Sequence, residues 1–155
     1  MPADREEVAA GIVGGVERQR AAWMVTAAAV AAVFGLLLPW AASGTRSRSS
    51  IELLSSANAL DVLSALERWA LLGVWFGVVV AVAVGLVAVA WHRIDLGALA
   101  FAAVGPALVV AVVIVCRSPL SPEWGAYTSS GLGLVASIGS GMLLARRSVD
   151  EGSRR

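Results

Sequence analysis

Hydrophobic residues gather in four stretches of this chain, each about as long as the 20 residues that an α-helix needs to cross a bilayer. The stretches run over residues 21–41, 69–91, 96–116 and 125–145, and their interiors hold no Asp, Glu, Lys, Arg or His. This pattern predicts an all-α integral membrane protein built as a four-helix bundle.

The polar residues divide the rest of the chain into an N-terminal segment (1–20), an outer loop (42–68) and a tail (146–155) around a membrane domain over 21–145. Apolar residues recur every three or four positions in 3–20, which predicts a helix. This helix is either a solvated extension of the first span or a docking helix for a cytoplasmic partner. The first apolar stretch exceeds the 7–15 residues of a signal-peptide core, so we expect it to be retained.

All twelve basic residues are arginines, and their distribution predicts the orientation in the membrane. With both termini cytoplasmic, eight lie inside and four outside, which satisfies the positive-inside rule. The inner set is Arg5, Arg18, Arg20, Arg93, Arg146, Arg147, Arg154 and Arg155; the outer set is Arg46, Arg48, Arg68 and Arg117. The chain is therefore expected to be a multi-pass protein of the inner (plasma) membrane.

Small residues recur every fourth position in three of the apolar stretches, and such spacing lets membrane helices approach closely. These tracks either pack inside the bundle or face a helix of another protein, and the second and fourth stretches are the candidates for the partner interface. The tracks are Ala27, Ala31 and Gly35; Gly73, Gly77, Ala81 and Gly85; and Ser129, Gly133, Ser137 and Gly141.

Five tryptophans lie at the ends of the predicted spans, which is typical of an aromatic belt at the headgroup level. They are Trp23, Trp40, Trp69, Trp91 and Trp124, while Trp75 lies inside the second span. Gly105 and Pro106 stand mid-span in the third stretch, where proline predicts a kink. No polar residue is close to them in the sequence, so we expect the kink to fit the helix to its neighbours.

The outer loop begins with a run of Gly, Arg and Ser residues and continues with an apolar periodicity around Leu53–Leu66. The second half predicts an amphipathic helix on the membrane surface or against a partner. Arg46 and Arg48 can pair with lipid phosphate or with acidic residues of a neighbouring protein. These two arginines complete the set of candidate interface residues.

Motifs for catalysis are missing from the sequence. The one histidine, His92, lies beside Arg93 in a short turn, where we expect it to cap a helix end, and it leaves no set of ligands for a metal. The polar cluster at 127–130 is expected to bond backbone carbonyls. We therefore predict no catalytic residue, cofactor or metal. A net charge of +1 also argues against a nucleic-acid partner.

The segment LLPWAASGTRSRSSIELL, Leu37–Leu54, resembles the first outer loop of small four-span membrane proteins of mycobacteria and related actinobacteria. The resemblance rests on Pro39, Trp40, Ser43, Gly44 and the Arg/Ser run that follows. It implies a partner subunit within an envelope assembly, such as a Mce-type lipid importer or a respiratory supercomplex.

Together these observations favour a non-catalytic accessory subunit that binds the integral-membrane subunits of a larger complex and contacts membrane lipid. A lipid-transport assembly of the Mce type is preferred as the partner, and a respiratory supercomplex is the alternative. A homo-oligomeric transporter or pore is the rival class, although it needs a polar path that these spans do not provide. An enzyme ranks third.

Overall fold

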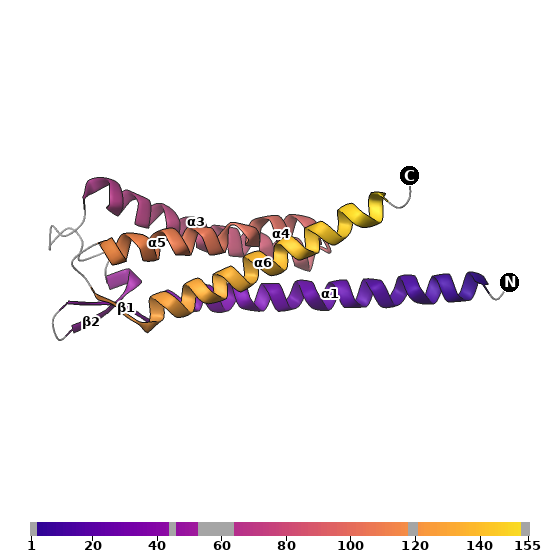
Figure 1. Cartoon of the computed structure of the whole chain (residues 1–155), viewed down its shortest axis with the longest axis horizontal. Helices are drawn as coiled ribbons and strands as arrows, with labels where there is room; N and C mark the ends of the chain where they lie inside the picture. Colours follow the sequence, from indigo (N-terminus) through magenta and orange to yellow (C-terminus); the bar gives the residue numbers. More distant parts are fainter. Residues whose placement is uncertain (1–2, 44–45, 53–63, 118–120, 153–155) are drawn as a thin grey trace.

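The chain folds into long helices that run side by side and carry a small sheet at one end, as a computed structural model shows (Figure 1). The structure describes residues 3–43, 46–52, 64–117 and 121–152. Its helices are α1 (Ala3–Gly35), α3 (Ala65–Ala90), α4 (Ile94–Ala102), α5 (Val104–Arg117) and α6 (Trp124–Gly152). Both termini and the turn between α3 and α4 lie toward one end of the molecule, and the strands lie toward the other.

Three helical segments of the described chain are long and apolar enough to cross a membrane: Ala65–Ala90, Ile94–Arg117 and Trp124–Arg146. They correspond to the predicted spans over 69–91, 96–116 and 125–145. α1 is one continuous helix from the N-terminal segment into the first apolar stretch, so the predicted helix over 3–20 is confirmed.

The predicted first span is wrong at its C-terminal end, because α1 ends at Gly35 and not at residue 41. Pro39 has no N–H to donate to the Gly35 carbonyl, and it disfavours helical geometry at the residue before it. The chain turns over 36–38 and continues as strand β1 (Pro39–Ser43). The helical part of the stretch, residues 21–35, is therefore about 22 Å long.

The expectation of a purely helical fold also needs correction, because a three-stranded antiparallel sheet closes the loop end. β1 lies between β2 (Arg46–Ser49) and β3 (Ser121–Pro122), and Ala42 is paired with both Ser47 and Ser121. Much of the predicted amphipathic helix, residues 53–63, lies outside the described residues. α3 begins after Ser64, whose side chain forms a capping box with Glu67.

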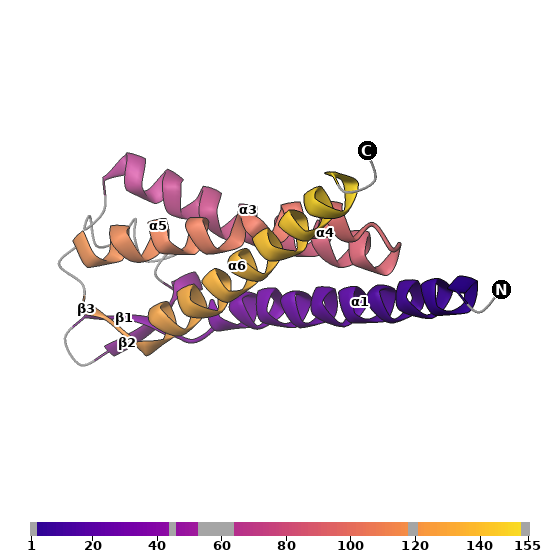
Figure 2. The same cartoon turned by 45° about the vertical axis from the view of Figure 1, so that its right-hand side comes forward.

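α6 packs against three of the other helices in the described chain. It crosses α1 in both views and also packs against α4 and α5 (Figures 1 and 2). Small buried residues permit these approaches: Ala29 and Ala32 on α1 and Ala136 on α6 are fully buried. At the end of the molecule away from the sheet, Arg18 of α1 forms an ion pair with Asp95 at the start of α4, at 2.6 Å. This ion pair joins the two helices.

The predicted kink in the third stretch is confirmed, since the helix breaks at Ala103 between α4 and α5. A polar side chain from another helix lies at this break. The Gly105 N–H donates to Ser137 Oγ at 2.9 Å, and Ser137 Oγ donates to the Phe101 carbonyl at 3.3 Å. In a regular helix these two backbone groups would bond each other, so the hydroxyl of Ser137 replaces that bond.

At Gly105 the backbone of α5 comes close to α6. A Cβ at Gly105 would lie 2.8 Å from the Gly133 carbonyl oxygen and 2.6 Å from Ser137 Oγ. Gly131, two residues from Gly133 on α6, has open space where its Cβ would be. Substitutions at Gly105 and at Gly131 therefore distinguish an effect on helix packing from an effect on helix propensity.

We predict that Gly105→Ala lowers the free energy of unfolding by about 1–3 kcal/mol, because the added methyl group overpacks a backbone contact. Gly131→Ala gains the same intrinsic helix propensity without a clash and should be neutral or stabilising. Thermal unfolding of the purified protein in mild detergent, followed by circular dichroism, measures both. Equal melting temperatures for the two variants would contradict the assigned contact.

Candidate functional site

The small residues of α6 mostly face the interior of the chain. Ser129 is fully buried against Gly35 of α1, and Gly133 lies against Gly105 and Leu108 of α5. Ser137 occupies the helix break described above. Gly141 differs from them because it is exposed, with open space beyond it. Three of the four members of this track therefore serve internal packing.

The track on α3 is divided between an inner and an outer part. Gly85 is buried against the ring of Phe101 in α4. Gly73 and Gly77 are exposed, and a Cβ on either would meet no atom within 4 Å. Ala81 is half-buried between the two parts.

Gly73, Gly77 and Ala81 line an open groove on the surface of the bundle. Its volume is about 400 Å³, and its other wall comes from Ala103, Val104 and the next turn of α5. The groove is apolar and lies along one of the helices long enough to cross a membrane. It is the part of the predicted small-residue interface that forms a groove on the surface of the chain.

Arg46 and Arg48 lie on β2 at the edge of the sheet. Residues two apart on a strand point to the same face, so the two guanidinium groups share one side of β2. Together with Ser47 and Glu52 they line a hollow of about 490 Å³. Ser47 Oγ donates to Glu123 Oε1 at 2.8 Å, which ties this strand to the residue before α6.

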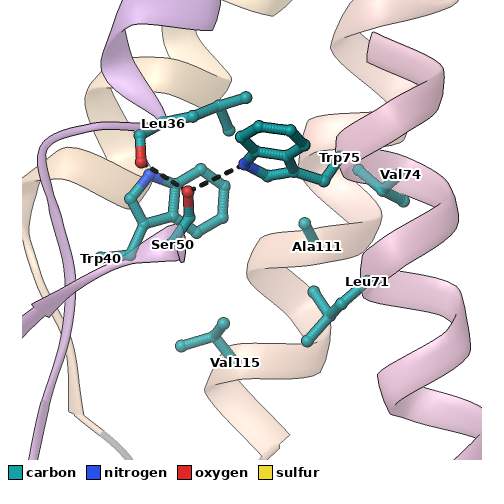
Figure 3. Close-up of a pocket in the computed structure, with 8 residues that line it drawn as sticks. All are labelled: Leu36, Trp40, Ser50, Leu71, Val74, Trp75, Ala111 and Val115. Atoms are coloured by element: carbon teal, nitrogen blue, oxygen red, sulfur yellow. Dashed lines mark hydrogen bonds between the residues drawn. The ribbon is translucent and has the colours of Figure 1, made fainter. Parts of the chain in front are cut away.

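A hydrogen-bonded cluster of Trp40, Ser50 and Trp75 joins three segments at the loop end (Figure 3). Ser50 Oγ donates to the Leu36 carbonyl and accepts from Trp75 Nε1 at 3.2 Å. Trp40 Nε1 donates to the Gly35 carbonyl at 3.0 Å. The end of α1, the chain after β2 and the first turns of α3 are thereby held together.

This cluster satisfies the last carbonyl group of α1 and the carbonyl group of the residue that follows it. The Gly35 carbonyl accepts from Trp40 and from the Leu38 N–H, and the Leu36 carbonyl accepts from both the Oγ and the N–H of Ser50. Helix termini always leave such groups without intrahelical partners. Next to hydrocarbon an unsatisfied group costs several kcal/mol, so the cluster stabilises a helix that ends early.

The pocket beside the cluster is small and almost entirely apolar. Its volume is about 30 Å³, and its walls include Leu71 and Val74 of α3 and Ala111 and Val115 of α5 (Figure 3). A single water needs about 10–15 Å³ on this measure. The pocket is therefore a packing gap and too small for an organic substrate.

Buried hydroxyl groups elsewhere also bond to the backbone. Thr26, Ser129 and Ser140 each donate to the carbonyl four residues earlier on their own helix, and Ser130 donates to Leu108. Within the described chain, every buried side-chain nitrogen or oxygen has a hydrogen-bond partner. The prediction that the cluster over 127–130 serves backbone carbonyls is confirmed at Thr128, Ser129 and Ser130.

The tryptophans fit the belt pattern with one exception. Trp23, Trp69, Trp91 and Trp124 are exposed, in agreement with positions at a membrane surface. Trp40 is only 2% exposed, so its assignment to the belt is wrong. Its indole caps α1, and the sequence signal for this role is its position directly after Pro39.

His92 occupies the capping position that the sequence predicts. It has a positive φ of 57°, its N–H donates to the Val89 carbonyl, and the Arg93 N–H donates to the Ala88 carbonyl. These two bonds form the Schellman motif that commonly ends a helix. His92 thus reverses the chain between α3 and α4.

The described part of the segment that carries the resemblance to four-span actinobacterial proteins forms the turn after α1 and the strands β1 and β2. No known protein-family model, curated protein or solved structure matches this chain. The resemblance therefore stays a prediction that rests on the residues of this segment.

We predict that Ser50→Ala lowers the free energy of unfolding by about 1–3 kcal/mol, because it removes one bond to the Leu36 carbonyl and leaves the Trp75 indole unpaired. Ser47→Ala is the matched control, since the Ser47 hydroxyl also donates a hydrogen bond, to the Glu123 carboxylate, but is exposed. Urea or thermal unfolding in detergent measures both. A loss for Ser50→Ala no larger than that for Ser47→Ala would refute the structural role of the cluster.

Proposed function

We propose that this chain crosses the inner membrane four times, with both termini in the cytoplasm. Three described segments have the length and hydropathy of spans. The apolar part of α1 runs beside α6, and both termini lie toward the same end (Figures 1 and 2). The arginine distribution places that end inside.

We propose further that the protein is a non-catalytic accessory subunit that binds another integral-membrane protein. The observation that carries this proposal is the groove along Gly73, Gly77 and Ala81. Membrane helices associate by close packing, and glycine at every fourth position lets two backbones approach. Three of the four corresponding residues of α6 are already used inside the chain, whereas Gly73 and Gly77 remain accessible along the groove.

The polar groups favour a binding role over transport by this chain alone. A pore or transporter needs a polar path through the membrane. The buried polar groups in the described part of the bundle are hydroxyls, and those traced above are engaged with the backbone or with Trp75. On the outer face, Arg46 and Arg48 supply a second contact for acidic groups of the partner.

A lipid-transport assembly of the Mce type is the partner that we propose. The support for it is the resemblance of the Leu37–Leu54 segment to the outer loop of small actinobacterial membrane proteins. In such an assembly the α3 groove would hold a helix of a membrane subunit, and β2 would face the outer side.

We predict that Gly77→Leu releases the partner while leaving the chain itself folded. The side chain would fill the groove and hold the helices apart, which weakens the complex by about 1–3 kcal/mol, a loss of affinity of about 5- to 150-fold. Gly131→Leu is the matched control, since Gly131 is equally open but lies on α6.

Pull-down of the tagged chain from mild detergent, with the bound proteins identified and quantified, measures the effect. Gly131→Leu should retain the partner as the parent does. If Gly77→Leu retains it equally, or if the parent binds no membrane protein, the accessory-subunit proposal fails. Identification of subunits other than those of a lipid importer would replace the proposed partner.

A further inference from the structure

A second apolar groove lies at the other end of α3, on the outside of the α3–α4 hairpin. Its volume is about 320 Å³. Ala83, Val84 and Val87 of α3 form one wall, and Leu96 of α4 forms the other. These α3 residues and Leu96 are exposed. From Ala83 to Trp91 the groove follows about 12 Å of helix.

Trp91 and Arg93 close the groove at the end where the chain turns. Trp91 is 76% exposed, and tryptophan prefers the headgroup level of a bilayer. The Schellman motif at His92 fixes this turn, so Arg93 stands directly beyond the apolar walls. The groove therefore joins a long apolar surface to a cation at the expected depth of the phosphates.

The carboxylate closest to Arg93 along the chain is engaged by another arginine. Asp95 lies two residues from Arg93, but it accepts from Arg18 of α1 at 2.6 Å. Arg93 itself is exposed. Arginine binds phosphate oxygens through two parallel hydrogen bonds, which makes it well suited to a phospholipid headgroup.

We propose that this groove binds one phospholipid with an anionic headgroup, with its phosphate at Arg93 and one acyl chain along Ala83, Val84 and Val87. The site lies in the leaflet that faces the termini. The proposal depends on the chain being embedded in a membrane, and it does not depend on the partner complex. It adds a defined lipid to the general contact with membrane that any spanning protein makes.

Native mass spectrometry of the purified chain tests the proposal. The protein is released from nanodiscs that contain equal amounts of phosphatidylglycerol and phosphatidylcholine. The parent should retain one phosphatidylglycerol in preference to phosphatidylcholine. Arg93→Gln should lower the retained phosphatidylglycerol about fivefold, the factor expected for one arginine at a membrane surface.

Two further variants separate the charge from the groove. Arg146→Gln removes an exposed arginine of α6 that does not line the groove, and it should leave lipid retention unchanged. Val84→Trp should fill the groove and lower retention of both lipids. Glycerol 3-phosphate, which has the headgroup charge without acyl chains, should not displace the bound lipid.

The proposal is overturned if the parent retains the two lipids equally, if Arg146→Gln acts as strongly as Arg93→Gln, or if glycerol 3-phosphate displaces the lipid. Because no partner protein is present in this experiment, the outcome is independent of the accessory-subunit role. A parent chain that binds no membrane protein in the pull-down but retains phosphatidylglycerol would show that only the accessory-subunit proposal fails. A parent chain that binds a partner but shows no lipid preference would show that only the lipid proposal fails.

Discussion

The structure depends on the need to hydrogen-bond every backbone group that lies in an apolar environment. Two prolines interrupt the backbone ladder of the apolar segments. Pro39 ends α1, and Pro106 follows the break between α4 and α5. At both places a side chain from elsewhere supplies the bonds: Trp40 and Ser50 at the end of α1, and Ser137 of α6 at the break. Without these donors and acceptors each interruption would leave polar groups facing hydrocarbon.

These bonds also explain which small residues face the interior of the bundle and which face its exterior. Ser137 and Gly133 hold α6 against the break in the third apolar stretch, so these two small residues of α6 face the interior. The Ser50 cluster holds the first turns of α3 to the end of α1, while Gly73 and Gly77 of the same helix remain open to the outside. One set of small residues is thereby used for folding and another is left for binding. The packing of the helices determines which set is buried. The four-residue spacing of small residues is the same in the second and fourth apolar stretches and does not show this difference.

The sequence predicts those features that depend on local pattern. The apolar spans within α3 and α6, the kink near Pro106 and the capping role of His92 follow from hydropathy, proline chemistry and the turn between two spans. The continuation of α6 to Gly152, through the predicted tail, does not follow from them. The β-strands, the burial of Trp40 and the insertion of Ser137 at the break were not predicted. Ser137 lies 32 residues from Gly105, and Ser50 lies 14 residues from Leu36. Such contacts arise only when helices pack, so no local pattern in the sequence indicates them.

The central claim is that α1, which is helical only to Gly35, still carries the chain across the membrane. Cysteine labelling in a Cys116→Ser background tests this most directly, with Glu17→Cys before the crossing and Ser121→Cys in β3. Both positions are exposed in the structure. A membrane-impermeant maleimide should label Ser121→Cys in intact cells and Glu17→Cys only after the membrane is permeabilised. Labelling of both positions in intact cells, or of neither, would contradict the crossing by α1, and the reversed pattern would contradict the proposed orientation.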